Sequence, residues 1–299
     1  MKDFKQFSYQ SHENHFCSYA QGGEKEKHAK TWFKKDTVDA WRHERMYNSL
    51  DPLIIEYPNA TWLTVGDGRY GKDAHYIKEK GLSVLATDIS DILLKEGKEI
   101  GFIDDYKKEN AEHLSFTNGE FDFVFCKESY HHFPRPMIAL YEMLRVAKIG
   151  TVLIEPTDRY VFTTFMEVLF GNLKDIIKCI LKKKVVKNSF EESGNYVYSI
   201  SKREVEKVAL SMNYPVVAFK GINDYYTEGV EYEKATDSNK LFKQAKRVII
   251  LKDLTTKLKL KQYNYLVAII FKEEISSSLR NYLRKAGYEF IILQRNPYI

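Results

Sequence analysis

The glycines in residues 65–71, VGDGRYG, form a turn whose residue types suit ligand binding. They follow TWLTV (61–65), which we predict to be a buried strand, and glycine there lets the backbone turn sharply and lets a ligand approach backbone amides. Seventeen residues after Gly71, Asp88 closes a second predicted strand, LSVLAT (82–87). A carboxylate near that place accepts hydrogen bonds from ribose hydroxyls. The pattern therefore predicts a ligand with a ribose diol.

A second set of polar residues follows two later predicted strands. His131 and His132 come shortly after FDFVFC (121–126), and Glu155 ends TVLIE (151–155). In open α/β sheets, ligands bind at these carboxyl ends of the strands. His131, His132 and Glu155 are therefore the candidate catalytic residues, either as a general base for a hydroxyl acceptor or as contacts to the substrate. Capping of the loop and of the next helix is the alternative role for the same side chains.

Short apolar runs alternate with charged helical stretches from residue 58 to residue 158, which predicts a parallel sheet with right-handed crossovers. Helices are expected at 31–50, 72–80, 90–100 with Ser90 as N-cap, 136–146 and 201–212. We predict an α/β, doubly wound, mostly parallel, seven-stranded Rossmann-like sheet, to which a last helix and strand (277–293) are an addition. Its strands are 61–65, 82–87, a weak one near Tyr106, 121–126, 151–155, 215–219 and 265–271.

The motifs around the glycine turn resemble those of class I S-adenosylmethionine (SAM) methyltransferases, especially the group similar to ubiquinone and menaquinone biosynthesis methyltransferases. The resemblance covers residues 61 to about 158, roughly a third of the chain. Several motifs in the right order are more specific than one glycine turn. They are WLTVGDGRYGKDAHYI, GLSVLATDIS, NAEHLSF, FDFVFCKESYHHFPRP and MLRVAK.

The resemblance implies SAM as the cofactor and assigns residues to each part of it. Asp88, with Ile89 beside it, would bind the ribose hydroxyls. The turn that would hold the methionine part consists of Gly66, Asp67 and Gly68. The residues after the third strand that would reach the adenine are Asn110, Ala111 and Glu112. Those after the fourth strand that would line the methionine and the substrate are Lys127, Glu128 and Ser129.

The sequence departs from the family pattern in three places. Thr64 stands where the family often has an acid, two residues before the first glycine of the turn. The third glycine comes one residue late, at Gly71. The usual Asp-Ala after the third strand is Asn110-Ala111, which can still hydrogen-bond an adenine but without charge. These changes affect the exact contacts to SAM more than the binding itself.

Both flanks of the core (51–158) are predicted to cover the ligand site. Residues 1–50 form an N-terminal helical and aromatic lid, residues 159–200 a helical cap, and residues 201–299 the rest of the sheet. Apolar residues at steps of three and four in 162–184 predict one long amphipathic helix, or two helices broken near Gly171. We expect this segment to cap the substrate pocket, with a dimer face or an anionic membrane surface as alternatives. The lid aromatics are Tyr9, His12, His15, Phe16 and Tyr19.

Composition narrows the class of protein. A chain of 299 residues with 44% apolar residues can build a large core, and a net charge of +5 is too modest for a nucleic-acid binder. We find no signal peptide and no apolar run long enough to span a membrane, and therefore expect a cytoplasmic protein. The three cysteines are far apart and odd in number, and the histidines lack a tight ligand spacing, so we expect neither disulfides nor a metal.

We therefore expect a SAM-dependent methyltransferase that acts on a small-molecule acceptor. O-methylation of a sugar or another biosynthetic intermediate is the favoured reaction, since the glycine turn together with ESGNYVYSISKREVEK (192–207) is similar to methyltransferases of bacterial surface-glycan or secondary biosynthesis. The literal G-x-G-x-x-G leaves an NAD(P)-dependent oxidoreductase as the alternative enzyme. A catalytically silent SAM-fold partner protein is the non-enzyme alternative. The acceptor and the oligomeric state stay open.

Overall fold

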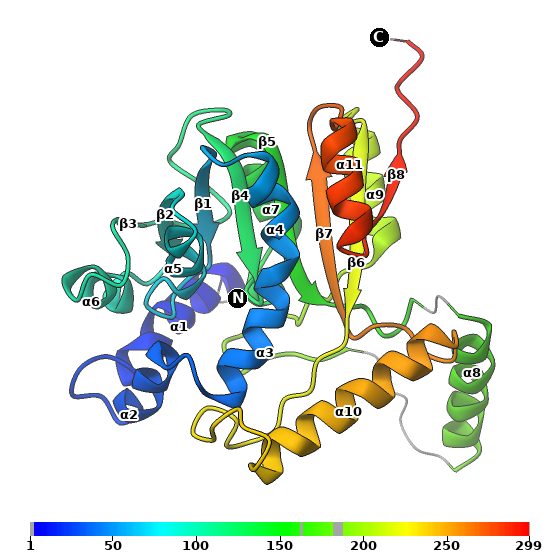
Figure 1. Ribbon diagram of the computed structural model, residues 1–299, viewed down its shortest axis with the longest axis horizontal. Helices are drawn as coiled ribbons and strands as arrows, with labels where there is room; N and C mark the ends of the chain where they lie inside the picture. The colour runs from blue at the N-terminus through cyan, green and yellow to red at the C-terminus, as the bar shows by residue number, and fades with distance from the viewer. Residues whose placement is uncertain (1–2, 162–163, 182–187, 299) are drawn as a thin grey trace.

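A single mixed sheet forms the centre of the structure, a computed structural model that describes residues 3–161, 164–181 and 188–298 (Figure 1). The strand order is β3-β2-β1-β4-β5-β7-β6-β8. Neighbours pair in parallel from β3 to β5, whereas β7 runs antiparallel to β5 and β6, and β8 antiparallel to β6. The strands are β1 (Thr61–Val65), β2 (Ser83–Asp88), β3 (Tyr106–Lys108), β4 (Phe121–Lys127), β5 (Ala147–Pro156), β6 (Val216–Ile222), β7 (Tyr265–Phe271) and β8 (Glu289–Ile292).

This architecture confirms the predicted α/β, mostly parallel class and corrects the strand count from seven to eight. The additional strand is β8, which pairs with the first four residues of β6, from Val216 to Phe219. The strand order reverses between β2 and β4, on either side of β1. Because the crossovers then diverge to opposite sides, a crevice opens at the carboxyl ends of β1 and β4, where doubly wound folds bind ligands.

Alternating side chains along the strands divide the core into two layers. Val124 and Cys126 of β4 pack on the face covered by α7 (Pro136–Val146) and α9 (Lys202–Ser211). Phe123 and Phe125 point to the opposite face. The helices that cover this second face are α3 (Val38–Tyr47), α4 (Asp51–Glu56), α5 (Lys72–Glu79) and α11 (Ser277–Lys285). Helices on both faces define the doubly wound arrangement.

Several predicted boundaries need correction. The helix expected at 31–50 is broken into a 3₁₀ turn (Lys30–Phe33), α3, a second 3₁₀ turn (Asn48–Leu50) and α4, because Thr37 caps α3 by accepting a hydrogen bond from Ala40 N. Ser90 does not cap the next helix, α6 (Ile92–Glu99), whose N-cap position is Asp91. Strand β5 starts at Ala147, earlier than predicted, because the chain turns extended directly after α7.

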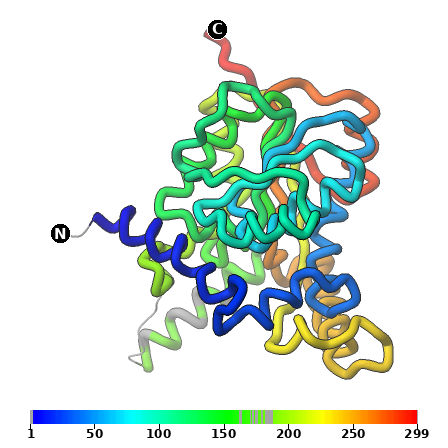
Figure 2. Tube along the Cα trace, turned by 90° about the vertical axis from the view of Figure 1, so that its left-hand side faces the viewer, coloured from blue at the N-terminus to red at the C-terminus, as the bar shows by residue number. Residues whose placement is uncertain are grey.

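The segments outside the core lie at the carboxyl ends of the strands. They include α1 (Phe4–His15), a 3₁₀ turn (Phe16–Ser18), α2 (Glu26–Ala29), α8 (Phe165–Ile180) and α10 (Lys240–Lys257). Figure 2 shows α1 next to the stretch around residue 195, and His12 Nε2 lies 3.1 Å from Asn195 Oδ1. Of the amphipathic segment predicted at 162–184, residues 162, 163 and 182–184 lie outside the described residues. None of the described helices is long and apolar enough to cross a bilayer.

Candidate active site

A cavity of about 630 Å³ opens at the carboxyl ends of β1, β2 and β4. Its size falls within the range of small-molecule and cofactor sites. All ten residues predicted to bind the cofactor line it, as does Ser129. The sheet topology therefore brings together side chains that the sequence separates by more than sixty positions. The ten are Gly66, Asp67, Gly68, Asp88, Ile89, Asn110, Ala111, Glu112, Lys127 and Glu128.

The glycine turn leaves no room for side chains at its first two glycines. Gly66 has a φ of 77°, and a Cβ there would lie 2.5 Å from the Cβ of Ser129. A Cβ on Gly68 would overlap the Phe16 ring and lie 3.0 Å from Asp88 Oδ2. The third glycine of the turn comes one residue later than in the family pattern. At the family's position Tyr70 adopts the left-handed conformation (φ 60°), and Gly71 occupies the N-cap position of α5. The turn is a close-packed backbone cradle that lines the cavity.

Asp67 stabilises this turn from the inside. Its carboxylate accepts hydrogen bonds from Thr64 Oγ1 (2.9 Å) and from the backbone amides of Asp73 (3.0 Å) and Ala74 (2.9 Å) at the start of α5. Burial, and the nearby Asp73 carboxylate, raise the pKa of Asp67. Thr64 stands where the family often has an acid, and it is a hydrogen-bond donor to Asp67. The Asp67 carboxylate is therefore already hydrogen-bonded to Thr64, Asp73 and Ala74.

Asp88 offers a carboxylate to the cavity. It is almost fully buried and accepts a hydrogen bond from Ser90 N at 2.8 Å. Burial raises the pKa of Asp88 to about 7, although amides of neighbouring residues oppose the shift. A ribose diol would supply further donors to this carboxylate, so the site fits the ribose of an adenosyl cofactor.

On the side predicted to hold the adenine, Glu112 connects the site to the N-terminal segment. Its carboxylate accepts hydrogen bonds from Tyr9 Oη (2.6 Å), Arg135 Nε (2.6 Å) and Arg135 N (2.8 Å). Asn110 Oδ1 accepts a hydrogen bond from Glu112 N at 2.9 Å. Asn110 and Ala111 also line the cavity, whereas the side chain of Glu112 fastens α1 over it. No sequence motif predicts this pairing.

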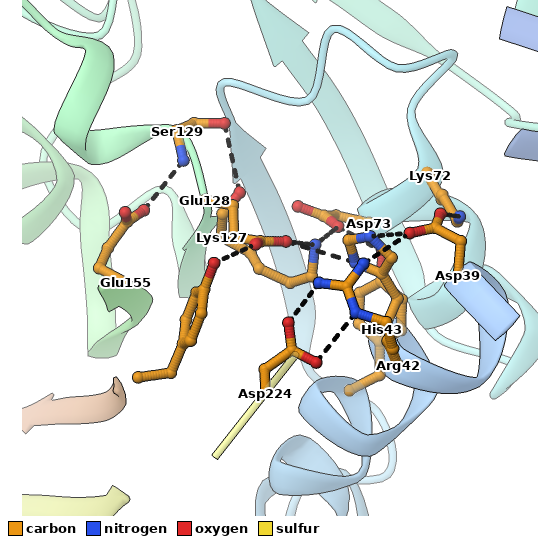
Figure 3. Close-up of polar contacts among 12 residues, drawn as sticks. Asp39, Arg42, His43, Lys72, Asp73, Lys127, Glu128, Ser129, Glu155 and Asp224 are labelled. Atoms are coloured by element: carbon orange, nitrogen blue, oxygen red, sulfur yellow. Dashed lines mark hydrogen bonds and ion pairs between the residues drawn. The ribbon is translucent and has the colours of Figure 1, made fainter. Parts of the chain in front are cut away.

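Charged residues form the inner end of the cavity (Figure 3). Lys127 Nζ lies 3.5 Å from Asp73 Oδ1 and 3.2 Å from Glu128 Oε2, and Tyr265 donates a hydrogen bond to Glu128 Oε1 at 2.8 Å. Burial raises the pKa of Glu128, but Lys127 and His43 outweigh it and hold the pKa below its usual value. Glu128 is therefore a fixed anion at this end of the cavity.

His43, from α3, lies in the middle of this charged cluster and lines the cavity. Its Nε2 lies 3.4 Å from Asp39 Oδ1 and its Nδ1 lies 3.3 Å from Glu128 Oε2. Nδ1 is buried and makes no hydrogen bond to any described residue. Burial lowers the pKa of His43, although both carboxylates oppose the shift. Sequence reasoning missed this histidine; its only signal was Asp39 four residues earlier on a predicted helix.

The three predicted catalytic residues have different positions. Glu155 is fully buried and accepts hydrogen bonds from the amides of Ser129 and Tyr130, both at 2.9 Å, while His131 Nδ1 lies 2.6 Å from its carboxylate. This arrangement holds the turn after β4. His132 lines the cavity, with Nδ1 2.8 Å from Glu191 Oε2, whereas His131 and Glu155 are not among the lining residues. Among the described residues, no group of acids, cysteines and histidines is placed to hold a metal ion.

Aromatic side chains of the N-terminal segment form the outer wall of the cavity. Tyr19 stacks on Trp32 with ring centroids 5.3 Å apart, and the Arg69 guanidinium lies 5.2 Å from the centre of the Trp32 ring. Phe190 and Ser193, which follow α8, also line the cavity. Segments far apart in the sequence thus enclose the site, one before the core and one after β5.

The crevice at the switch point, the glycine cradle and the buried acid that ends β2 define a doubly wound protein with a candidate ligand site at the carboxyl ends of the strands. Residues 63–154, about a third of the chain, match the family model described as methyltransferase domain. This match confirms the predicted resemblance to methyltransferases over these residues and favours a methyltransferase over an oxidoreductase.

Individual proteins are also similar to this chain. A 2-methyl-6-phytyl-1,4-hydroquinone methyltransferase from Synechocystis is 33% identical over 143 residues, which cover 45% of this chain and 44% of that protein. The chain thus spans less than half the length of this curated relative. Magnesium protoporphyrin IX methyltransferase from Synechocystis, solved with bound S-adenosylhomocysteine, is 12% identical, with 91% of this chain and 100% of that chain covered and a TM-score of 0.49. A SAM-dependent methyltransferase from Methanosarcina mazei is 18% identical, with 74% and 97% covered and a TM-score of 0.45.

Proposed function

We propose that this protein transfers a methyl group from SAM to a hydroxyl oxygen of a small polar molecule bound at the inner end of the cavity. The observation that carries the proposal is His43, whose buried Nδ1 lacks a hydrogen bond beside the predicted cofactor cradle. Because His43 lines the cavity, its imidazole is suited to accept the proton of an acceptor hydroxyl.

The cofactor would lie between the glycine turn and the residues after β2, β3 and β4. Gly66 and Gly68 leave backbone free for its methionine part, Asp88 would accept hydrogen bonds from the ribose, and Asn110 and Ala111 would contact the adenine. When bound, SAM supplies an electrophilic methyl group that an acceptor oxygen attacks in line. The residues of the chain align the two reactants and exclude water from between them.

His43 has the electrostatic surroundings of a proton acceptor. Burial keeps the imidazole neutral before the reaction, because it lowers the pKa of His43. Once the acceptor proton reaches the ring, Asp39 and Glu128, at 3.4 and 3.3 Å, would stabilise the imidazolium. His132, predicted from the sequence, is the second candidate base, since it lines the cavity and lies against Glu191. His131 and Glu155 would act on the acceptor only by positioning the turn that carries Ser129.

The charged inner end favours an acceptor with several hydroxyl or anionic groups. Lys72 and Lys127 reach the cavity there with Glu128, and an apolar acceptor would remove solvent from these charges without offering them hydrogen bonds. A sugar or a similar biosynthetic intermediate is the acceptor class that we propose. The hydroquinone named for the curated relative is the contrasting acceptor class. The N-terminal segment would act as a lid, the segment around α8 as a cap, and a cytoplasmic location is part of the same proposal.

Binding and transfer test the proposal separately. Purified protein should gain thermal stability with SAM and none with NAD, and the reverse result would overturn the cofactor assignment. With labelled SAM, sugars and sugar nucleotides should accept methyl groups where alkylated hydroquinones do not.

Substitution identifies the base. His43→Asn should lower kcat by about 10²–10⁴-fold and leave the SAM dissociation constant unchanged within about twofold. His132→Asn is the matched variant. A large loss of kcat in His132→Asn together with normal turnover in His43→Asn would reverse the assignment.

A further inference from the structure

Two helices, α8 and α10, expose large apolar side chains. On α8, Phe165, Ile176 and Ile180 are 78%, 55% and 73% exposed, and on α10, Ile250, Leu254 and Leu258 are 65%, 52% and 60% exposed. Residues 165, 176 and 180, and likewise 250, 254 and 258, fall on one face of their helices. Contiguous apolar patches of this kind mark interaction sites on soluble surfaces. We call these two apolar faces the α8/α10 surface.

The two helices form one surface because the chain after α10 contacts α8. Gln262 N donates a hydrogen bond to Glu167 Oε1 at 2.9 Å, and Gln262 Nε2 donates to Asp158 O, just before α8, also at 2.9 Å. Figure 1 shows α8 beside the C-terminal end of α10. The exposed side chains of both helices can therefore meet one partner.

Positive charge is concentrated along α10 and just after it. Residues 240–261 contain eight Lys and Arg and a single acid. Their net charge is +7, whereas the whole chain has +5, so the rest of the chain is net negative. Arg247 and Lys243 are exposed one and two turns before Ile250, near the same face of α10. Apolar side chains bordered by lysines are the pattern of a helix that lies in a membrane interface.

We propose that the α8/α10 surface docks the protein on a membrane that carries anionic lipids. The apolar side chains would enter the boundary between headgroups and acyl chains, and the lysines and arginines would meet the lipid phosphates. A second copy of the chain fits less well, because a symmetric dimer would bring two strongly cationic surfaces together. The inference does not depend on the proposed methyl transfer.

Docking would place the cavity close to the lipid surface. Phe190, which follows α8, is 72% exposed and also lines the cavity. In the sequence, Phe190 lies ten residues after Ile180, where α8 ends. A polar acceptor attached to a lipid could reach the site from the membrane without leaving it.

Vesicle flotation of the full chain tests the inference. The protein should float with vesicles of phosphatidylcholine and phosphatidylglycerol and stay below vesicles of phosphatidylcholine alone, and high salt should release it. Ile250→Glu combined with Leu254→Glu should reduce the bound fraction at least about tenfold. Ile100→Glu is the matched control, since Ile100 is 62% exposed at the end of α6, and it should float like the wild type.

Each contrary result overturns the inference. Failure to float, equal binding to both kinds of vesicle, or equal flotation of the double variant and the control would do so. Light scattering adds a further check, because a dimer that the double variant dissociates would assign the surface to a second copy. A SAM-induced rise in Tm equal to that of the wild type would show that the double variant is folded.

Discussion

Asp88 connects cofactor binding to pH at the scale of one residue. Burial raises the pKa of its carboxyl to about 7, so about half of the ligand-free molecules carry a proton there at that pH. Ribose hydroxyls would donate to the ionised form, and binding therefore favours loss of the proton. The direction follows from linkage: affinity for SAM is full above the ligand-free pKa and falls as the pH drops below it.

The expected change is roughly tenfold weaker binding of SAM at pH 6 than at pH 8, one proton being coupled to binding. Isothermal titration at several pH values measures it. Asp88→Asn keeps the shape of the side chain but cannot ionise. Its dissociation constant for SAM should therefore be higher than that of the wild type and should not change between pH 6 and pH 8. A wild-type dissociation constant that is equally flat would remove Asp88 from the cofactor site.

A comparison of alanine substitutions at Gly66 and Gly101 distinguishes the effect of backbone strain from that of steric crowding. Both have positive φ, but a Cβ on Gly66 would meet Ser129 whereas one on Gly101 meets nothing within 4 Å. Gly101→Ala should cost about 1 kcal/mol of unfolding free energy in urea. Gly66→Ala should cost clearly more and weaken SAM binding at least about tenfold. Equal losses of stability in the two variants, with SAM binding intact, would show that the turn tolerates side chains.

Local patterns explain which site residues the sequence could predict. The glycine turn and Asp88 are set by short motifs at strand ends, so both were identified before the fold was known. His43 could not be identified in this way, because α3 reaches the cavity only through packing against the sheet and through the contacts of Arg42 with Asp224. The roles of Thr64 and Asp67 likewise depend on where α5 begins.

Among the helices and strands too, local patterns predict some features, whereas others depend on contacts between distant segments. Helix α7 matches its prediction from Pro136 to Val146, because the proline starts it and apolar residues recur at helical spacing. Strand β8 was recognised as an element, yet its pairing with β6 is non-local and no sequence period encodes it. The position of α1 is likewise non-local, since it depends on the hydrogen bonds of Glu112 with Tyr9 and Arg135.

The hydrogen bond from Tyr9 to Glu112 should control how long SAM stays bound. Tyr9→Phe removes a donor to a buried carboxylate and should loosen α1, since such bonds contribute about 1.5–3 kcal/mol. We expect a several-fold faster dissociation of SAM in stopped flow, with little change in Tm because the core is untouched. Tyr141→Phe, on the exposed side of α7, is the control. An unchanged dissociation rate in Tyr9→Phe would mean that α1 does not gate the site.

One buried ion pair joins the two halves of the whole molecule. Arg42, on α3, donates from Nε to Asp224 Oδ1 at 3.0 Å and from a second nitrogen to Asp224 Oδ2, and its Nη1 donates to Asp39 Oδ1 at 3.0 Å. All three side chains are buried, and Asp224 follows β6. This pair fixes α3, and with it His43, against the C-terminal part of the sheet.

Asp224→Asn should therefore destabilise the whole molecule. Removal of one partner leaves the Arg42 charge buried and undercompensated, which costs about 3–5 kcal/mol, whereas an exposed pair contributes about 0–1 kcal/mol. Asp36→Asn breaks such an exposed pair, between Lys234 and Asp36 at 3.3 Å, and is the matched control. Equilibrium unfolding in urea should show a much lower midpoint for Asp224→Asn alone. Similar midpoints for both variants would mean that neighbouring charges, Asp39 above all, hold Arg42 in place without Asp224.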